Sequence, residues 1–178
     1  MKIILVSYSA LWPLAFEKEK DKISALSPPV GIAGIEHIGS TAVEGLIAKP
    51  IIDMMIGLVD FERDAALFVE IMTNIGYRYN ANYEYLMPYR RFFQYAATDL
   101  NYNIHTVQHG SEFWERHLLF RNYLRHNSRK RDQYAAHKKA LADQDWDNTG
   151  DYADAKTPFI RQLEQEAKLF FLEENSAL

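Results

Sequence analysis

A Gly-Ser pair and a single aspartate are the residues of this sequence best suited to hold phosphate and metal. Gly39-Ser40 follows one apolar run, and Asp53 interrupts the next run, Ile51 to Leu58. Free backbone N–H groups at a helix start, together with a hydroxyl, can hold phosphate oxygens. A carboxylate within an apolar strand is costly unless it is paired or bound to a metal. We expect Gly39, Ser40 and Thr41 to bind phosphate and Asp53 to hold magnesium or manganese in a catalytic role.

Each of these residues also has a plainer explanation. A Gly-Ser dipeptide occurs in ordinary turns and helix caps. Asp53 could cap the short helix expected after Ser40, or it could pair with Lys49 or an arginine.

Three cations, Lys49, Arg90 and Arg91, are candidate phosphate partners. Lys49 immediately precedes the strand that carries Asp53, and Arg91 begins a later predicted strand. Lysine offers phosphate a point charge, whereas arginine offers a bidentate contact. Because Arg90 and Arg91 are adjacent on a strand, one must face away from the other, and we favour Arg91. The alternative is that these side chains lie on a solvated surface and bind no ligand.

Two histidines suggest a second kind of metal site. His37 ends one predicted strand and His105 lies on another, so three neighbouring strands could bring both imidazoles to Asp53. Such a set favours a transition metal over magnesium. Each histidine could instead be a hydrogen-bonded structural residue.

Two later groups of residues at helical spacing indicate packing faces. Residues 112–126 carry a tryptophan, a histidine, a leucine and two arginines at helical steps, which predicts one packed helix face. The alternative is that Arg121 or Arg125 reaches the cleft of the binding site. Tyr152, Lys156 and Phe159 also share one helix face, for which we expect packing rather than chemistry.

The periodicity of apolar residues predicts an α+β fold of one domain, residues 1–178, in which a mixed sheet is followed by three covering helices. The expected strands are 3–6 at an edge, 32–38, 51–58, one beginning at 77, and two antiparallel strands at 91–97 and 103–108 around a turn at 98–101. The expected helices are 12–26, ended by Pro28-Pro29, about one turn at 41–46, 61–75, 111–127, 128–144 and 152–174.

Composition narrows the class of protein. The 178 residues are 48% hydrophobic, and no apolar run approaches the roughly 20 residues that span a bilayer, so we expect a soluble protein without a membrane partner. The absence of cysteine fits a reducing cytoplasm. A formal charge of -4 and a pI near 5.9 argue against broad attraction to nucleic acid.

The segment HIGSTAVEGLIAKPIIDMMIG, residues 37–57, resembles the GrpB-like family. The resemblance continues in RRFF at 90–93, IHTV at 104–107, WERHLLFR at 114–121, YLR at 123–125, and at Tyr152, Lys156, Phe159 and Ile160. The family looks like a divergent branch of the nucleotidyltransferase superfamily, which implies a mixed-sheet core with a Gly-Ser turn before an acidic strand.

This sequence departs from the superfamily pattern at the acidic strand. The resemblance implies two carboxylates two residues apart that bridge two metals, and here those positions are Asp53 and Met55. A further acid is expected on a neighbouring strand, where His105 is the strong ligand. Family members often have His-x-His there, whereas this chain has Asn103-Ile104-His105.

Three hypotheses for function follow. The first is a nucleotidyltransferase-like protein that binds a nucleoside triphosphate, or another phosphorylated small molecule, with a divalent metal, and transfers a nucleotidyl group to a small acceptor. The second is a non-catalytic nucleotide- or phosphate-binding module, and the third is a structural or protein-interaction domain. The acceptor, the base and the oligomeric state stay open.

Overall fold

Within residues 1–26, 29–97 and 100–176, which the structure describes, five strands form one sheet in the order β1-β2-β5-β4-β3. This computed structural model places β1 (Ile32–Ile38) antiparallel to β2 (Ile51–Leu58), and β2 parallel to β5 (Asn101–Gln108). β4 (Arg90–Ala96) pairs antiparallel with β5, and the two-residue β3 (Arg78–Tyr79) pairs with β4. The sheet is therefore mixed, as the sequence predicts.

The strand register brings the chemically important residues together on one face of the sheet. Ile38 pairs with Asp53, and Asp53 pairs in turn with Asn103. Two positions further along the same strands, Met55 pairs with His105. Because paired residues point to the same face and side chains alternate along a strand, all five lie on one side of the sheet.

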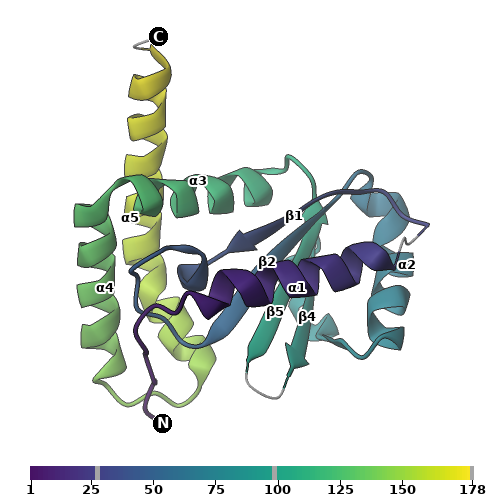
Figure 1. Cartoon of the computed structure of the whole chain (residues 1–178), viewed down its shortest axis with the longest axis horizontal. Helices are drawn as coiled ribbons and strands as arrows, with labels where there is room; N and C mark the ends of the chain where they lie inside the picture. The colour runs from purple at the N-terminus through teal and green to yellow at the C-terminus, as the bar shows by residue number, and fades with distance from the viewer. Residues whose placement is uncertain (27–28, 98–99, 177–178) are drawn as a thin grey trace.

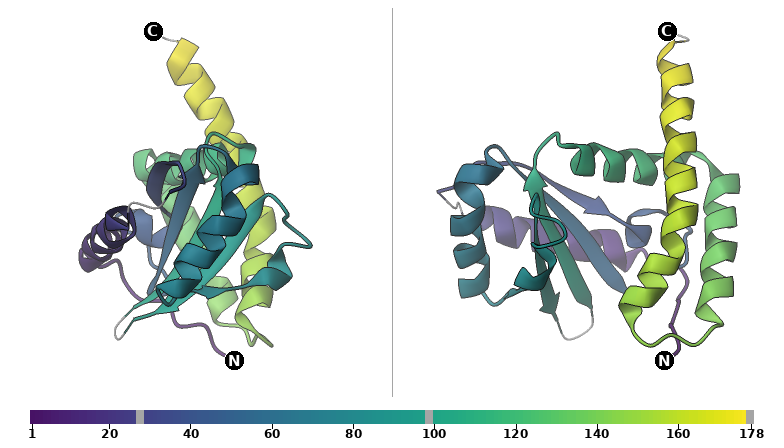
Figure 2. Two further views of the ribbon diagram at one scale, coloured as in Figure 1. Left: turned by 90° about the vertical axis from the view of Figure 1, so that its right-hand side faces the viewer. Right: turned by 180° about the vertical axis from the view of Figure 1, so that it is seen from behind.

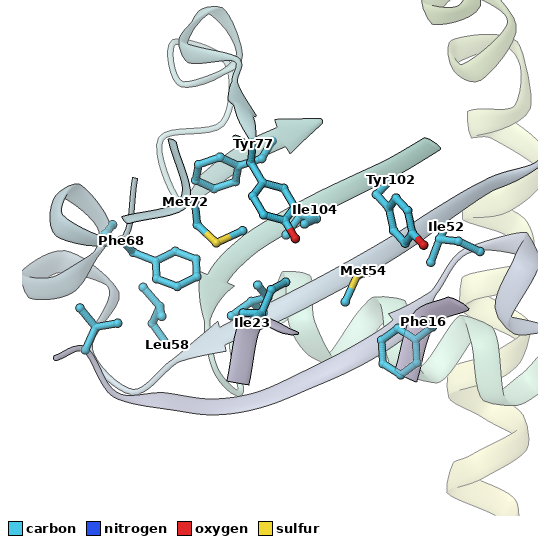
Figure 3. Close-up of a cluster of buried hydrophobic side chains, with 14 of the residues drawn as sticks. Phe16, Ile23, Ile52, Met54, Leu58, Phe68, Met72, Tyr77, Tyr102 and Ile104 are labelled. Carbon is cyan, nitrogen blue, oxygen red and sulfur yellow. The ribbon is translucent and has the colours of Figure 1, made fainter. Parts of the chain in front are cut away.

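The opposite face is covered by α1 (Leu11–Ala25) and α2 (Phe61–Asn74), which enclose the main hydrophobic core (Figure 3). The Asp60 side chain accepts a hydrogen bond from the Arg63 N–H and caps α2. Residues of β2 and of both helices fill this core, including Phe16, Ile23, Ile52, Met54, Leu58, Phe68 and Met72.

Three consecutive helices gather on the face that carries Asp53 and at the adjoining end of the sheet (Figures 1 and 2). They are α3 (Glu112–His126), α4 (Ser128–Ala142) and α5 (Thr149–Ser176). The Ser111 hydroxyl caps α3 by accepting from the Trp114 N–H, and Asn127 caps α4. The yellow C-terminal end of α5 extends beyond the other elements (Figure 1).

The element order agrees with the sequence prediction apart from three local differences. The predicted edge strand at 3–6 is wrong, because this segment makes a single bridge, between Val6 and Ala48. The ladder cannot continue through Pro50, which has no N–H to donate. The turn expected at 41–46 is a shorter 3-10 helix, η1 (Ser40–Ala42), and the strand expected from 77 is β3 followed by η2 (Ala81–Tyr83). Residues 28, 98 and 99 of the predicted breaker and turn lie outside the described residues.

Candidate functional site

A cleft opens where the sheet face that carries Asp53 meets α4 and α5. Its first compartment has a volume of about 210 Å³ and lies beside η1 and the start of β2. Three lysines from three different segments line it, together with one carboxylate. The residues that matter for its chemistry are Ser40, Thr41, Lys49, Asp53, Asn103, His105, Lys138, Tyr152 and Lys156.

A second compartment of about 350 Å³ adjoins the first. Both are lined by Ser40, Asp53, His105 and Lys156, so Asp53 stands where they join. The second compartment is bounded by α3 and α5, and both charged and apolar side chains line it. Its other lining residues include Arg116, His117, Phe120, Tyr134, Ile160, Arg161 and Glu164.

Glycine is required at position 39, where β1 turns into η1. Gly39 has φ +70° and ψ -168°, a combination that is essentially restricted to glycine. A Cβ atom at this position would lie 2.5 Å from Oδ2 of Asp53. The backbone of the Gly-Ser loop therefore lies directly against the Asp53 carboxylate.

Lys138 links α4 to this loop. Its side chain is almost entirely buried, and its ammonium group donates to Oγ of Ser40 at 3.0 Å and to the carbonyl oxygen of Ile47. The same ammonium lies 4.7 Å from the centre of the Tyr134 ring. The predicted phosphate-binding loop thus has the amine of a buried lysine in contact with its hydroxyl group.

Lys49 and Lys156 approach the ring of Tyr152. Their ammonium nitrogens lie 5.7 Å and 4.5 Å from its centroid. Tyr152 is buried, and its hydroxyl has no hydrogen-bond partner within the described ranges. The ring of Tyr152 therefore holds two cations at the edge of the cleft, and within the described residues neither ammonium group forms a direct ion pair.

Burial lowers the pKa of all three lysines. The pKa of Lys138 falls to about 7, because of burial and then the charge of Lys156. The pKa of Lys156 falls to about 8, through burial and the charge of Lys49, against an opposing effect of Asp53. Burial also lowers the pKa of Lys49, again opposed by Asp53. The lysines lose protons more readily here than in water.

These pKa shifts predict how the stability of the unliganded protein depends on pH. Both Lys138 and Lys156 regain the ordinary pKa of 10.5 on unfolding, so above pH 7 the unfolded chain binds more protons than the folded chain. The free energy of unfolding should consequently rise between pH 7 and pH 9. Urea denaturation at several pH values measures this slope, which Lys156→Met should reduce. An equal slope in the variant would contradict the assignment.

Asp53 is held by a short relay of amides. Its Oδ1 accepts from Nδ2 of Asn103 at 2.9 Å, and Oδ1 of Asn103 accepts from Nε2 of Gln94 at 3.1 Å. Burial raises the pKa of Asp53, while the Asn103 hydrogen bond and the charges of Lys156 and Lys49 lower it. The carboxylate is therefore paired by hydrogen bonding and long-range charge rather than by a direct ion pair.

Met55 shows why a second carboxylate is absent from β2. Its side chain is fully buried beneath α3, against Val107, Phe113 and Trp114. An acid at that position would enter a hydrophobic cluster without a partner. The structure does not fit a two-metal centre built on residues 53 and 55.

The structure does not bring His37 to Asp53. His37 pairs with Met54, on the other face of the sheet, and its ring stacks on Phe16 at 4.8 Å between centroids. Thr41 donates its hydroxyl hydrogen to the Ile51 carbonyl, so it must accept from Nε2–H of His37, 3.0 Å away. Burial lowers the pKa of His37 to about 4. Thr41 reaches the cleft with its hydroxyl already engaged.

His105 does line both compartments, but in a form suited to donate a hydrogen bond. Its Nδ1 lies 3.1 Å from Nη1 of Arg90, and because arginine can only donate, Nδ1 accepts. In the neutral ring Nε2 then carries the hydrogen. Burial and the charge of Arg90 lower the His105 pKa well below its usual value, which keeps the ring neutral. Within the described residues, no three His, Asp or Glu side chains are grouped to hold a metal.

His117 has the opposite tautomer. Its Nδ1 donates to the Phe113 carbonyl at 2.7 Å, which leaves the Nε2 lone pair free to accept. Burial, followed by the charge of Arg116, lowers its pKa to about 4. The second compartment thus contains one histidine that can donate, His105, and one that can accept, at 6.5 Å between ring centroids.

The arginines singled out in the sequence lie outside the cleft. Arg91 forms an ion pair with Glu84 at 3.3 Å and donates to the Pro88 carbonyl. The structure therefore does not bring it to the predicted phosphate site. Arg121 donates to the Glu36 carboxylate and Arg125 to a backbone carbonyl, so the packing interpretation of their helix face is the one that the geometry favours.

Lys138 and Lys156 line the cleft, although neither is predicted as a site residue from the sequence. The helical spacing of Tyr152 and Lys156 predicts a packing face, and the two do share a face, but that face lines the cleft. Lys138 carried no sequence signal, because it lies among other lysines and arginines on a polar helix. Only the tertiary position of α4 distinguishes it from its exposed neighbour Lys139.

Comparisons with known proteins agree with each other. The family profile described as GrpB protein matches residues 2–166. The chain is 35% identical to YqkA of Bacillus subtilis over 176 residues, covering 99% of this chain and 50% of YqkA. It is 28% identical over 166 residues to the glutamate-rich protein GrpB of Alkalihalophilus pseudofirmus, covering 91% and 94%. The crystal structure of conserved protein GrpB from Enterococcus faecalis superposes with a TM-score of 0.80 at 33% identity, covering 94% and 99%. The chain thus spans half the length of YqkA and nearly all of the two GrpB proteins.

Proposed function

The chain belongs to the GrpB protein family, and from that premise and the geometry of the cleft we propose that it binds a nucleoside triphosphate. The observation that carries the proposal is that Lys49, Lys138 and Lys156 line one compartment together with Ser40 of the Gly-Ser loop. A linear triphosphate carries several negative charges. The compartment is suited to it because three lysines line it and Asp53 is the one carboxylate among its lining residues. Charge-assisted hydrogen bonds from lysine to phosphate are among the stronger contacts that a protein can make.

Asp53 is the residue that would hold a divalent metal. Magnesium and manganese accept one protein carboxylate when phosphates and water complete the coordination, so Asp53 could hold at most one ion, and only together with the phosphates. Such an ion would neutralise charge that develops on the phosphates during transfer. His105 offers an N–H rather than a lone pair, which disfavours a transition metal at this position.

The second compartment is the place for an acceptor. A hydroxyl group there could accept from Nε2–H of His105 and donate to Nε2 of His117. That pair of contacts would orient its oxygen for in-line attack on the α-phosphorus, with pyrophosphate as the leaving group. The position of Asp53 between the two compartments suits a reaction between ligands held on either side.

A binding protein without catalysis is the second candidate. The observation in its favour is Met55, because the buried cluster around it leaves Asp53 as a single acid on β2. Such a protein would retain the lysines and the Gly39–Ser40 loop. Measuring pyrophosphate release with ATP, GTP, CTP or UTP and a panel of small alcohols separates the two candidates, because only the enzyme releases pyrophosphate.

Calorimetric titration with these four triphosphates in the presence of magnesium tests the proposal. We expect saturable binding of at least one nucleotide, which Ser40→Ala weakens by about tenfold because the loop loses its hydroxyl. Thermal unfolding of the variant checks that the fold is intact. If no triphosphate binds, both proposed functions are wrong and a structural or protein-interaction domain is the better description.

A further inference from the structure

We propose that the cleft binds polyphosphate without a divalent metal, with the ammonium groups of Lys49, Lys138 and Lys156 supplying the neutralising charge. This inference rests on the proposed function and concerns the same cleft. In this proposal the three lysine side chains neutralise the charge of the phosphates. A pair of metal ions does so in a site that has two carboxylates.

Positive charge exceeds negative charge in the first compartment. Three ammonium groups line it, and Asp53 is the one carboxylate among its lining residues. No ion pair joins any of the three lysines to a carboxylate in the part of the chain that the structure describes. Asp53 acts on Lys49 and Lys156 through space only.

The contacts of the three lysines are with uncharged groups. Lys138 donates to a hydroxyl and a carbonyl, whereas Lys49 and Lys156 approach the face of Tyr152. The charges of Lys49 and Lys156 repel each other, as do those of Lys156 and Lys138. Partly buried cations that repel one another are costly unless an anion neutralises them, so the unliganded cleft is electrostatically strained.

The positions where metal ligands would be needed hold few groups that can bind a metal. Met55 is sealed under α3, and His105 presents a hydrogen at Nε2. Asp53 already accepts from Asn103 through one oxygen, and its other oxygen lies against the Gly39 backbone. The cleft is thus poor in free ligands for cations and rich in free donors for anions.

The arrangement also indicates the shape of the anion. Lys49 precedes β2, Lys138 lies in the second half of α4, and Lys156 lies in the first half of α5. Three donors from three separate segments match a chain of linked phosphates better than one phosphate group. Inorganic tripolyphosphate should therefore bind more tightly than orthophosphate.

Titration of the full chain with inorganic tripolyphosphate tests this inference. The buffer is freed of metal by a chelating resin rather than by a soluble chelator, which would itself be a competing polyanion. We expect binding in metal-free buffer, and we expect Lys156→Met to weaken it by about tenfold because one charge-assisted contact is lost. Lys168→Met removes an exposed lysine from the same helix and should leave affinity unchanged.

A second readout separates binding from folding. Because Lys156→Met removes a repelling charge, the unliganded variant should unfold at a higher temperature than the parent, while tripolyphosphate should raise its unfolding temperature less. Binding of tripolyphosphate and nucleotides only when magnesium is present would overturn the inference and leave the proposed function standing. Failure of both ligands to bind under either condition would remove the proposed function and the inference together.

Discussion

Gly39→Ala is expected to lower the free energy of unfolding by about 3 kcal/mol and to abolish ligand binding by the remaining folded protein. The backbone at this position occupies a region nearly closed to other residues, which alone costs about 1–3 kcal/mol. The added methyl group would also displace the Asp53 carboxylate, 2.5 Å away, from its hydrogen bond with Asn103. Chemical denaturation measures the first effect and calorimetric titration the second.

Gly76→Ala is the matched control for this prediction. Gly76 also has a positive φ, +95°, but no described atom lies within 4 Å of the position a Cβ would take. Its substitution should cost about 1 kcal/mol through backbone strain and should not affect the cleft. Equal losses of stability in the two variants would show that contact with Asp53 has no energetic consequence.

Lys138→Met is expected to reduce the affinity for a nucleoside triphosphate on the order of 100-fold, since hydrogen bonds to charged groups can each contribute that much. The substitution removes the charge held against Ser40 and frees the loop hydroxyl from its fixed partner. Calorimetry with the nucleotide that the parent protein binds measures the loss. We expect the free energy of unfolding to change less than the free energy of binding. The removal of a buried charge offsets the lost hydrogen bond to the Ile47 carbonyl.

Lys139→Met provides the comparison within the same helix. Lys139 is exposed, adjacent in sequence and identical in formal charge, so it controls for the net charge of the protein. The affinity of the Lys139→Met variant for triphosphate should match that of the parent protein. Similar losses in both variants would mean that overall charge, rather than the position of Lys138, governs binding.

The sequence predicts the sheet and its covering helices because local patterns determine them. The continuous apolar run Ile51–Leu58 became β2, an interior strand of the sheet, and the side chains of Asp60 and Ser111 cap α2 and α3. The edge strand at 3–6 failed for a reason outside the segment, since Pro50 in its pairing partner cannot donate a hydrogen bond.

The candidate site was harder to predict because it depends on which face each strand presents. The spacing of His37 and His105 allowed a shared metal, but the alternation along β1 turns His37 toward α1. Lys138 illustrates the opposite problem, since nothing in a polar helix distinguishes the one lysine that packs inward. The Gly-Ser loop and Asp53 do lie together, as the structure shows directly in the close approach of Gly39.

We propose that the Gly39–Ser40 loop and the three lysines form one phosphate-binding cleft. A crystal structure of the chain grown with non-hydrolysable analogues of the four nucleoside triphosphates tests this most directly. We predict phosphate oxygens within hydrogen-bonding distance of Ser40 and of the ammonium groups of Lys138 and Lys156. Phosphates bound elsewhere on the molecule, with this cleft holding none, would contradict the account.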